Sequence, residues 1–232
     1  MGDLQANPGK NLTIKVGEQE YARYPVKTPI VKAGDDLVKI FSESVAPHWQ
    51  DGDLIAISEK IVAISQGRSY LLSDIKPGRL AKFLVKFVHK SPYGIGLGSP
   101  FTMELAVREV GALRMLLAAA VAAITKPFGV KGMFYRVAGN RVNAIDGPCE
   151  YSLPPSNQSA KLPPANPEKV VLELKDKLNH DFAIIDANDL GVEVLGNSSQ
   201  EYSNDLIKAI FKDNPLGQSR EQTPIAVVRK NF

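Results

Sequence analysis

Short apolar runs separated by polar turns recur along the chain, and their spacing predicts strands mixed with helices. Alternating polar and apolar residues at 12–16 indicate a half-exposed strand. Unbroken apolar runs at 54–57 and 182–185 indicate buried strands, and the run at 225–228 predicts a final strand. These segments supply the strands of the expected sheets.

Apolar positions three and four residues apart predict helices between these strands. The first helix begins after Asp35 or Asp36, because either side chain can accept a backbone N–H as the N-cap. A long helix over 102–125 is expected to bend or break near Gly111 and to end at Pro127. Further helices are predicted at 168–178 and 204–211.

The remaining segments are predicted to be loops or local pairings. Residues 91–100 indicate a loop, and 128–145 predicts a β-hairpin with its turn near Gly139. Several prolines at 147–167 predict an irregular, ligand-facing segment. Because strands and helices mix without a regular βαβ rhythm, we predict an α+β protein with mixed sheets and packed helices.

The composition is that of a globular protein, with residues 1–232 forming a single unit or two interleaved subdomains. The net charge of +3 comes from basic residues spread along the chain, so no nucleic-acid partner is expected. The single cysteine, Cys149, excludes an intrachain disulfide and fits a reducing compartment. No signal peptide is recognisable at the start of the chain. The most apolar run, 115–124, is too short for a membrane span, so we expect a buried helix there and a cytoplasmic protein.

Two aspartates follow apolar runs in the same way. Asp186 comes after 182–185 and Asp146 after 142–145, and each precedes a polar turn. A carboxylate at the C-terminal end of a strand is well placed to hold Mg²⁺ or Mn²⁺, because hard cations prefer oxygen ligands. Two such acids could share a metal cluster, since a cation between them removes their repulsion. They could equally be unrelated turn acids that accept backbone N–H groups, and both interpretations stay open.

Other signatures are weak or missing. The glycine-rich segment 94–98 lacks the G-x-G-x-x-G spacing, and no Walker A lysine pattern occurs, so a nucleotide site would be of another kind. His48, His89 and His180 lie far apart without metal-ligand spacing. Neither a G-x-S-x-G motif nor a basic residue beside Cys149 supports acyl-enzyme chemistry.

Several motifs resemble those of the coenzyme F(420) γ-glutamyl ligase family, in the same order over nearly the whole chain. They are TPIVKAGDDL at 28–37, DGDLIAISEKIV at 51–62 with QGR at 66–68, MEL at 103–105 with Glu109 and Arg114, LPPANP at 162–167, and LGQ at 216–218 with TPIAVVR at 223–229. The resemblance implies the family's fold and its intertwined homodimer.

The resemblance also implies a reaction. In that family GTP phosphorylates a carboxylate, and the amine of glutamate then displaces phosphate from the acyl phosphate. Divalent metals neutralise charge on the phosphates and hold the transferred group in line. The family therefore implies Mg²⁺ or Mn²⁺, GTP or ATP as co-substrate, glutamate and a carboxylate acceptor.

The matching positions imply roles for individual residues. Asp146 and Asp186 are expected to be catalytic metal ligands, Ala187 to contribute its carbonyl, and Gln218 to stand where the family has a glutamate ligand. The residues expected to bind the nucleotide are Pro29, Ile30, Val31, Glu59, Lys60, Gly217, Gln218 and Ser219.

The chain departs from the family pattern near these positions. The family's Gly-Ile-Asp-x-Ser-Asn is AIDGPC at 144–149, Gln218 replaces a glutamate, and the arginine-rich stretch after Asp186 is missing from a shortened segment. These changes indicate another acceptor, another nucleotide or lost catalysis. Two alternatives therefore accompany the ligase: a nucleotide-binding module of the same fold without ligase activity, and a purely structural interaction protein.

Overall fold

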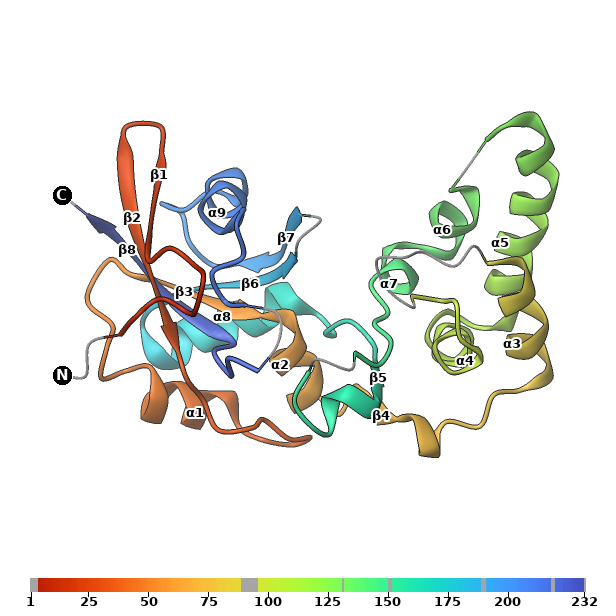
Figure 1. Cartoon of the computed structure of the whole chain (residues 1–232), viewed down its shortest axis with the longest axis horizontal. Coiled ribbons are helices and arrows are strands. Elements are labelled where there is room, and N and C mark those ends of the chain that lie inside the picture. The colour runs from red at the N-terminus through yellow and green to blue at the C-terminus, as the bar shows by residue number, and fades with distance from the viewer. Residues whose placement is uncertain are drawn as a thin grey trace. The chain divides into compact units, whose positions relative to one another are not determined.

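The structure is a computed structural model that describes residues 4–88, 96–130, 132–149, 152–188, 191–217 and 220–231 (Figure 1). The chain forms two compact units. The sheet unit comprises Met1–Gly67 and Pro164–Phe232, and the helical unit comprises Arg68–Pro163. The helical unit is therefore an insertion, in sequence, between the two parts that build the sheet unit.

A six-stranded mixed sheet in the order β1-β2-β8-β3-β6-β7 is the centre of the sheet unit. β3 and β6 are parallel, and the other neighbouring pairs are antiparallel. The strands are β1 (Thr13–Val16), β2 (Gln19–Val26), β3 (Leu54–Ser58), β6 (Asp181–Asn188), β7 (Gly191–Asn197) and β8 (Ile225–Asn231). The helices are α1 (Leu37–Ser44), α2 (Glu59–Ser65), α8 (Pro167–Leu178) and α9 (Asn204–Phe211).

Helices cover both faces of this sheet (Figure 1). On one face Phe41 of α1 belongs to a core that also contains Ile57 and Ile184, and on the other Phe211 of α9 shares a core with Ile185. Successive residues of one strand thus enter two different cores. This burial on both faces explains why the central strands are unbroken apolar runs in the sequence.

Local hydrogen bonds fix where the helices begin. The carboxylate of Asp36 accepts the backbone N–H of Val38 at 2.9 Å, and the Ser203 hydroxyl accepts that of Leu206 at 3.2 Å. Pro167 occupies the first turn of α8. The predicted helices and strands of the sheet unit are confirmed, whereas β2, β7 and α2 were not predicted from the sequence.

The helical unit contains α3 (Arg79–Leu84), α4 (Pro100–Val110), α5 (Ala112–Thr125), α6 (Met133–Ala138) and α7 (Asn140–Asn143). β4 (Ser69–Leu71) and β5 (Ser159–Lys161) form a small antiparallel sheet, and η4 (Ser156–Gln158) is a 3₁₀ turn before β5. The break predicted near Gly111 is confirmed, since its φ of 86° separates α4 from α5. β5 lies within 147–167, so this segment is not irregular throughout.

The predicted β-hairpin at 128–145 is wrong. The segment forms α6 and α7, and Gly132 and Gly139 lie at the ends of α6 with φ values of 78° and 99°. Its buried residues, Ala138, Val142 and Ile145, are spaced by four and three positions. That spacing is the period of a helix rather than of a strand, and it explains the outcome.

The prediction of a buried helix at 115–124 is only partly right. The segment lies in α5, but within the helical unit only Met115 and Ala118 of this helix are buried. Leu113 is 82% exposed and Ile124 67% exposed, because α6 and α4 pack against one face of α5 and leave the other uncovered. Among the described residues no helix combines the length and apolar character that a membrane span requires.

Candidate functional site at the C-terminal end of the sheet

Four strands of the sheet unit meet at one end of the sheet, which we call the C-terminal end. Val26 at the end of β2 pairs with Ile225 at the start of β8, which pairs with Ile57 near the end of β3, which pairs with Ile184 of β6. The segments beyond this row are therefore neighbours in space, although they are far apart in the sequence. Ligands of open sheets containing parallel strands bind at such carboxyl ends.

The residues with predicted binding roles in the sheet unit lie in these segments. Residues 29–31 follow β2, Glu59 and Lys60 open α2 directly after β3, and Asp186 and Ala187 belong to β6. Gly217 precedes β8. Gln218 and Ser219 lie outside the described residues, as does His89. The fold thus brings together segments that the sequence separates by more than 150 positions.

The segment after β2 is anchored to the segment before β8. The Thr28 N–H donates to the Gln222 carbonyl at 3.3 Å, and Gln222 Nε2 donates to the Thr28 carbonyl at 2.6 Å. Thr28 is buried, while the following Pro29 and Ile30 are exposed. Gln222 adopts a left-handed φ of 58°, an unusual conformation for a residue other than glycine. No feature of the sequence pointed to this contact.

Gly217 stands in a tightly bonded turn. Asn7 Nδ2 donates to the Pro215 carbonyl at 2.9 Å and to Thr223 Oγ1 at 2.8 Å, and the Thr223 hydroxyl donates to the Leu216 carbonyl at 3.0 Å. The φ of Gly217 is 78°, a conformation that favours glycine. The turn holds this backbone in place beside the start of β8.

Asp186 is not the last residue of its strand, contrary to the prediction. β6 continues to Asn188, because the residues after Asp186 pair with β7. Asp186 is in register with Glu193, so the two carboxylates share one face of the β6–β7 pair. Asn188 Nδ2 approaches Asp186 Oδ1 at 3.4 Å, and Glu193 pairs with Lys208 at 3.1 Å.

Asp146 belongs to the helical unit and follows α7, not a strand as predicted. Its backbone forms an isolated antiparallel bridge with Lys161: the Asp146 N–H donates to the Lys161 carbonyl at 3.0 Å, and the Lys161 N–H donates to the Asp146 carbonyl at 2.8 Å. Since Asp146 and Asp186 are in different units, their predicted convergence on one metal cluster stays a prediction.

The donor atoms differ around the two acids. In the described ranges no three His, Cys, Asp or Glu side chains are grouped as a metal site. At Asp186 the facing residue is Glu193, and carboxylate oxygens suit Mg²⁺ or Mn²⁺. At Asp146 the facing residue is Lys161, whose ammonium cannot act as a ligand. The oxygen donors at Asp186 therefore fit a divalent cation, and the role of Asp146 as a metal ligand stays a prediction.

Glu109 and Arg114 have structural contacts within the helical unit. The carboxylate of Glu109, 8% exposed, pairs with Arg68 at 2.8 Å and with Arg141 at 3.2 Å. Arg114 Nε donates to the Val137 carbonyl at 2.9 Å. Both side chains therefore hold the unit together.

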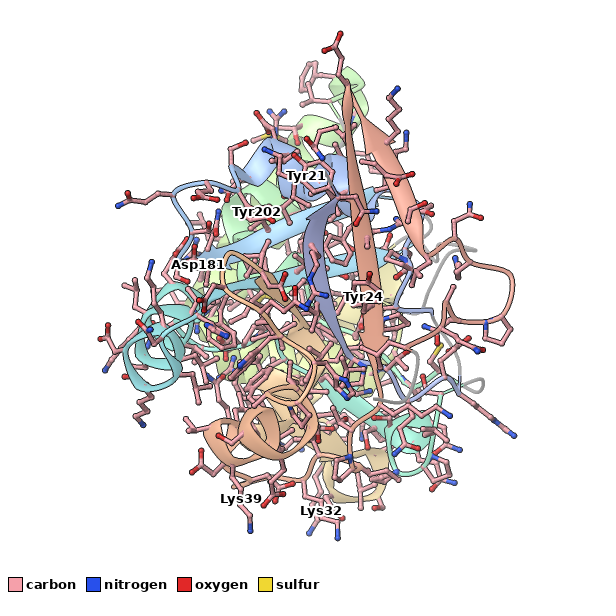
Figure 2. All side chains as sticks on the ribbon, turned by 90° about the vertical axis from the view of Figure 1, so that its left-hand side faces the viewer. Tyr21, Tyr24, Lys32, Lys39, Asp181 and Tyr202 are labelled. Atoms are coloured by element: carbon pink, nitrogen blue, oxygen red, sulfur yellow. The ribbon has the colours of Figure 1, made fainter. Side chains whose placement is uncertain are left out.

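The opposite end of the sheet carries a polar pocket in which two acids, Asp181 and Asp53, are paired with cations. Asp181 pairs with Lys175 at 2.7 Å, and Asp53 receives two hydrogen bonds from Arg229 at 2.9 and 2.7 Å. Burial, together with the charge of Asp53, raises the pKa of Tyr202 to about 12. Figure 2 shows Tyr202 and Asp181 in this region. These pairs show that two of its acids already have structural partners.

Residues 25–194 match the family described as F420-0:gamma-glutamyl ligase. The chain belongs to this family. The match includes both predicted metal acids, Asp146 and Asp186, and ends before Gly217. The α+β architecture with one mixed sheet and packed helices agrees with the family predicted from the motifs.

Individual known proteins resemble parts of the chain. A coenzyme F420:L-glutamate ligase of Methanopyrus kandleri is 24% identical over 177 residues, which are 76% of this chain and 59% of the relative. The enzyme of the same name from Methanosarcina acetivorans is 42% identical over 55 residues, 24% of this chain and 21% of that enzyme. An uncharacterised protein of Methanocaldococcus jannaschii is 35% identical over 78 residues, 32% of this chain and 26% of that protein. The chain thus spans at most 59% of these relatives.

Proposed function

We propose that this protein is a ligase that joins glutamate, or another amino acid, to a carboxylate acceptor at the expense of GTP or ATP. The observation that carries the proposal is the convergence of residues 29–31, Glu59, Asp186 and Gly217 on the C-terminal end of the sheet. Family membership supports the same reaction class. The names of the relatives supply glutamate as the first amino acid to test.

The chemistry follows two steps. The terminal phosphoryl group of the nucleotide passes to the acceptor carboxylate, forming an acyl phosphate and releasing the nucleoside diphosphate. The amine then attacks the acyl carbon, an amide bond forms, and phosphate leaves with loss of a proton from nitrogen. Catalysis of phosphoryl transfer depends on positioning and on charge stabilisation more than on covalent help from the protein.

Each segment at the C-terminal end of the sheet has a role in this proposal. Exposed Pro29 and Ile30 offer backbone groups and apolar surface to the base, with Thr28 anchored beneath them. The rigid turn at Gly217 presents backbone to the nucleotide, and Lys60 supplies positive charge from the start of α2. Residues 218 and 219 extend this turn in the sequence.

A divalent cation would be held from the β6 side of the site. Asp186, the carbonyl of Ala187 and Gln218 are the proposed ligands, because they offer oxygen donors. Mg²⁺ or Mn²⁺ bound there supplies charge neutralisation for the phosphates. Asp186 and its neighbours hold the ion, and Asn188 orients the Asp186 carboxylate.

The second candidate function is nucleotide binding without ligation. The observation that favours it is the direct pairing of β6 with β7, which leaves only residues 189 and 190 between the two strands. The arginine-rich stretch of the family is missing there, so a phosphate-bearing acceptor loses its expected contacts. An acceptor with less negative charge is the corresponding expectation for the ligase.

The decisive experiment measures phosphate release from GTP and ATP with Mg²⁺ or Mn²⁺, glutamate and a panel of carboxylate acceptors. The ligase predicts release that requires both amino acid and acceptor and that is lost in Asp186→Asn. Asp176→Asn, an exposed acid on α8, is the matched control and should keep activity. Nucleotide binding without acceptor-dependent release would favour the second function, and absence of nucleotide binding would exclude both.

The proposed enzyme acts in the cytoplasm as a homodimer. Light scattering at micromolar concentration should give twice the mass of the 25.2 kDa chain. A monomer under those conditions would contradict this part of the proposal.

A further inference from the structure

The helix α5 presents an apolar stripe on the outside of the helical unit. Its buried residues, Met115 and Ala118, lie on the side where α4 and α6 pack against it (Figure 1). On the other side, positions 113, 116, 117, 120 and 124 follow the three- and four-residue spacing of a single helix face. The large side chains of this stripe are Leu113, Leu116, Leu117 and Ile124, which are 82%, 46%, 56% and 67% exposed.

The stripe leaves α5 without a polar face. Arg114 and Thr125 are the only polar residues in the sequence of this helix. A helix that is apolar on all sides is normally enclosed by protein or by lipid, yet one side of α5 is open. Apolar side chains stay exposed beyond its end, at Phe128 with 81% and Val130 with 44%. Large exposed apolar patches mark sites of interaction with a protein or a membrane.

The sequence around this stripe is basic and contains no acid. From 110 to 145 there is no Asp or Glu, and the Lys and Arg residues are Arg114, Lys126, Lys131, Arg136 and Arg141. Arg141 pairs with Glu109, whereas the exposed Arg114, Lys126 and Arg136 are shown with no acidic partner. The surface that covers the stripe must therefore combine apolar groups with negative charge.

An anionic membrane surface meets both requirements. Its acyl chains take up apolar side chains at the interface, and its headgroups attract Lys and Arg. The 14 residues of α5 have a length of about 21 Å, less than the hydrocarbon core of about 30 Å, so the helix can lie in the surface without crossing it. A second copy of the same face would bring the same cations and no acid, so repulsion would oppose that contact.

We propose that the helical unit docks on an anionic lipid surface through the exposed stripe of α5, with Arg114 and Lys126 at the headgroups. Long basic side chains suit this place, because their stems lie along apolar surface while their charged ends reach the headgroups. The proposal goes beyond the ligase reaction and uses none of the residues assigned to the nucleotide or the metal ion. The association is peripheral, and salt weakens its electrostatic part.

Vesicle sedimentation with the full chain tests the proposal. Vesicles of phosphatidylcholine containing about one third phosphatidylglycerol should carry the protein into the pellet. Vesicles of phosphatidylcholine alone should bind it roughly tenfold more weakly, because they lack the negative surface charge. Raising the NaCl concentration from about 0.1 M to about 0.5 M should release the protein from the anionic vesicles, because salt screens the charges.

Matched variants test the two parts of the surface. Leu113→Gln combined with Leu117→Gln should weaken binding to the anionic vesicles roughly tenfold or more, since buried CH₂ groups supply the apolar part. Leu172→Gln, at a 52% exposed leucine of α8, is the control and should bind as the unmodified protein does. Lys126→Gln should weaken binding about fivefold. Lys212→Gln, at an exposed lysine that ends α9, should leave it unchanged.

Several results would overturn the proposal. Equal binding to neutral and anionic vesicles would exclude a role of the cations, and binding to neither would exclude a lipid surface. If light scattering shows that Leu113→Gln with Leu117→Gln halves the mass of the protein, a second copy covers the stripe instead. An unchanged mass with weaker vesicle binding is the expected result. Circular dichroism checks that this variant folds, and if it does not, the comparison of Lys126→Gln with Lys212→Gln decides.

Discussion

Thr28 and Gln222, which are 194 positions apart, are joined by two hydrogen bonds that run in opposite directions. One links the Thr28 N–H to the Gln222 carbonyl, and the other links the Gln222 amide to the Thr28 carbonyl. The pair connects the segment proposed to meet the nucleotide base with the turn proposed to meet its phosphates. The backbone of Gln222 is left-handed, a conformation that is strained for a residue other than glycine.

Gln222→Ala is therefore expected to weaken nucleotide binding without unfolding the protein. Loss of one hydrogen bond worth about 1 kcal/mol corresponds to a roughly fivefold higher Kd for GTP or ATP, measured by calorimetry. Gln200→Ala, at an exposed position in the sheet unit, is the matched control and should leave the Kd unchanged. An unchanged Kd in Gln222→Ala would show that the contact does not position the binding segment.

Asp213 makes the stability of the sheet unit sensitive to acid. Burial alone would raise the pKa of Asp213, but the hydrogen bond and charge of buried Arg23 outweigh it and lower that pKa below its usual value. A carboxylate with a lowered pKa stabilises the fold above its unfolded pKa, and this contribution disappears as the pH falls through the folded value. Thermal melting between about pH 5 and pH 3 should therefore show a falling Tm.

Asp213→Asn removes the titrating group and keeps an oxygen for Arg23. Its Tm should be lower than that of the unmodified protein at neutral pH, and the difference should shrink as the pH falls. Asp176→Asn serves as control, because this acid is exposed on α8. A pH profile of Asp213→Asn parallel to that of the unmodified protein would contradict the assignment.

The sequence predicted the sheet unit better than the helical unit, and the reason is physical. The central strands are buried on both faces, so runs such as 182–185 contain no polar residue and are easily recognised. β7 escaped recognition because it is an edge strand with exposed Glu193 and two glycines. In the helical unit, Gly139 suggested a hairpin turn, although Gly132 and Gly139 lie at the two ends of the short helix α6.

The candidate site was predictable only through the family resemblance. An apolar run followed by a polar turn pointed to Asp186. The same pattern placed Asp146 at the end of a strand, whereas this residue follows helix α7. Gln222 gave no signal, because its role depends on a partner that only folding brings near, Thr28.

Glu109 is predicted to be the most stability-sensitive acid of the helical unit. Its buried carboxylate receives Arg68 and Arg141, so Glu109→Gln leaves two arginines without their counter-charge. We expect a loss of about 2 kcal/mol or more in the free energy of unfolding, measured by urea denaturation. Glu173→Gln breaks an exposed pair with Lys169 and should cost no more than about 0.5 kcal/mol. Equal losses in the two variants would show that Glu109 is not a buried charge.

Gly196 of β7 is required for the close approach of that strand to the start of α8. A Cβ atom at this position would lie 2.8 Å from both the carbonyl carbon and the oxygen of Pro167 and 3.0 Å from the Glu168 nitrogen. These are backbone atoms, so no side-chain movement can relieve the clash, and overpacking of this kind costs about 1–3 kcal/mol. Gly196→Ala should therefore lower the stability by this amount in urea denaturation. Gly78→Ala is the control, because the nearest contact of its Cβ would be an ordinary 3.4 Å to a side-chain atom, the Oε2 of Glu104. Since Gly196 is in register with Ile184, a displaced β7 would also disturb the Asp186–Glu193 pair, and Mn²⁺ binding should weaken in Gly196→Ala but not in Gly78→Ala.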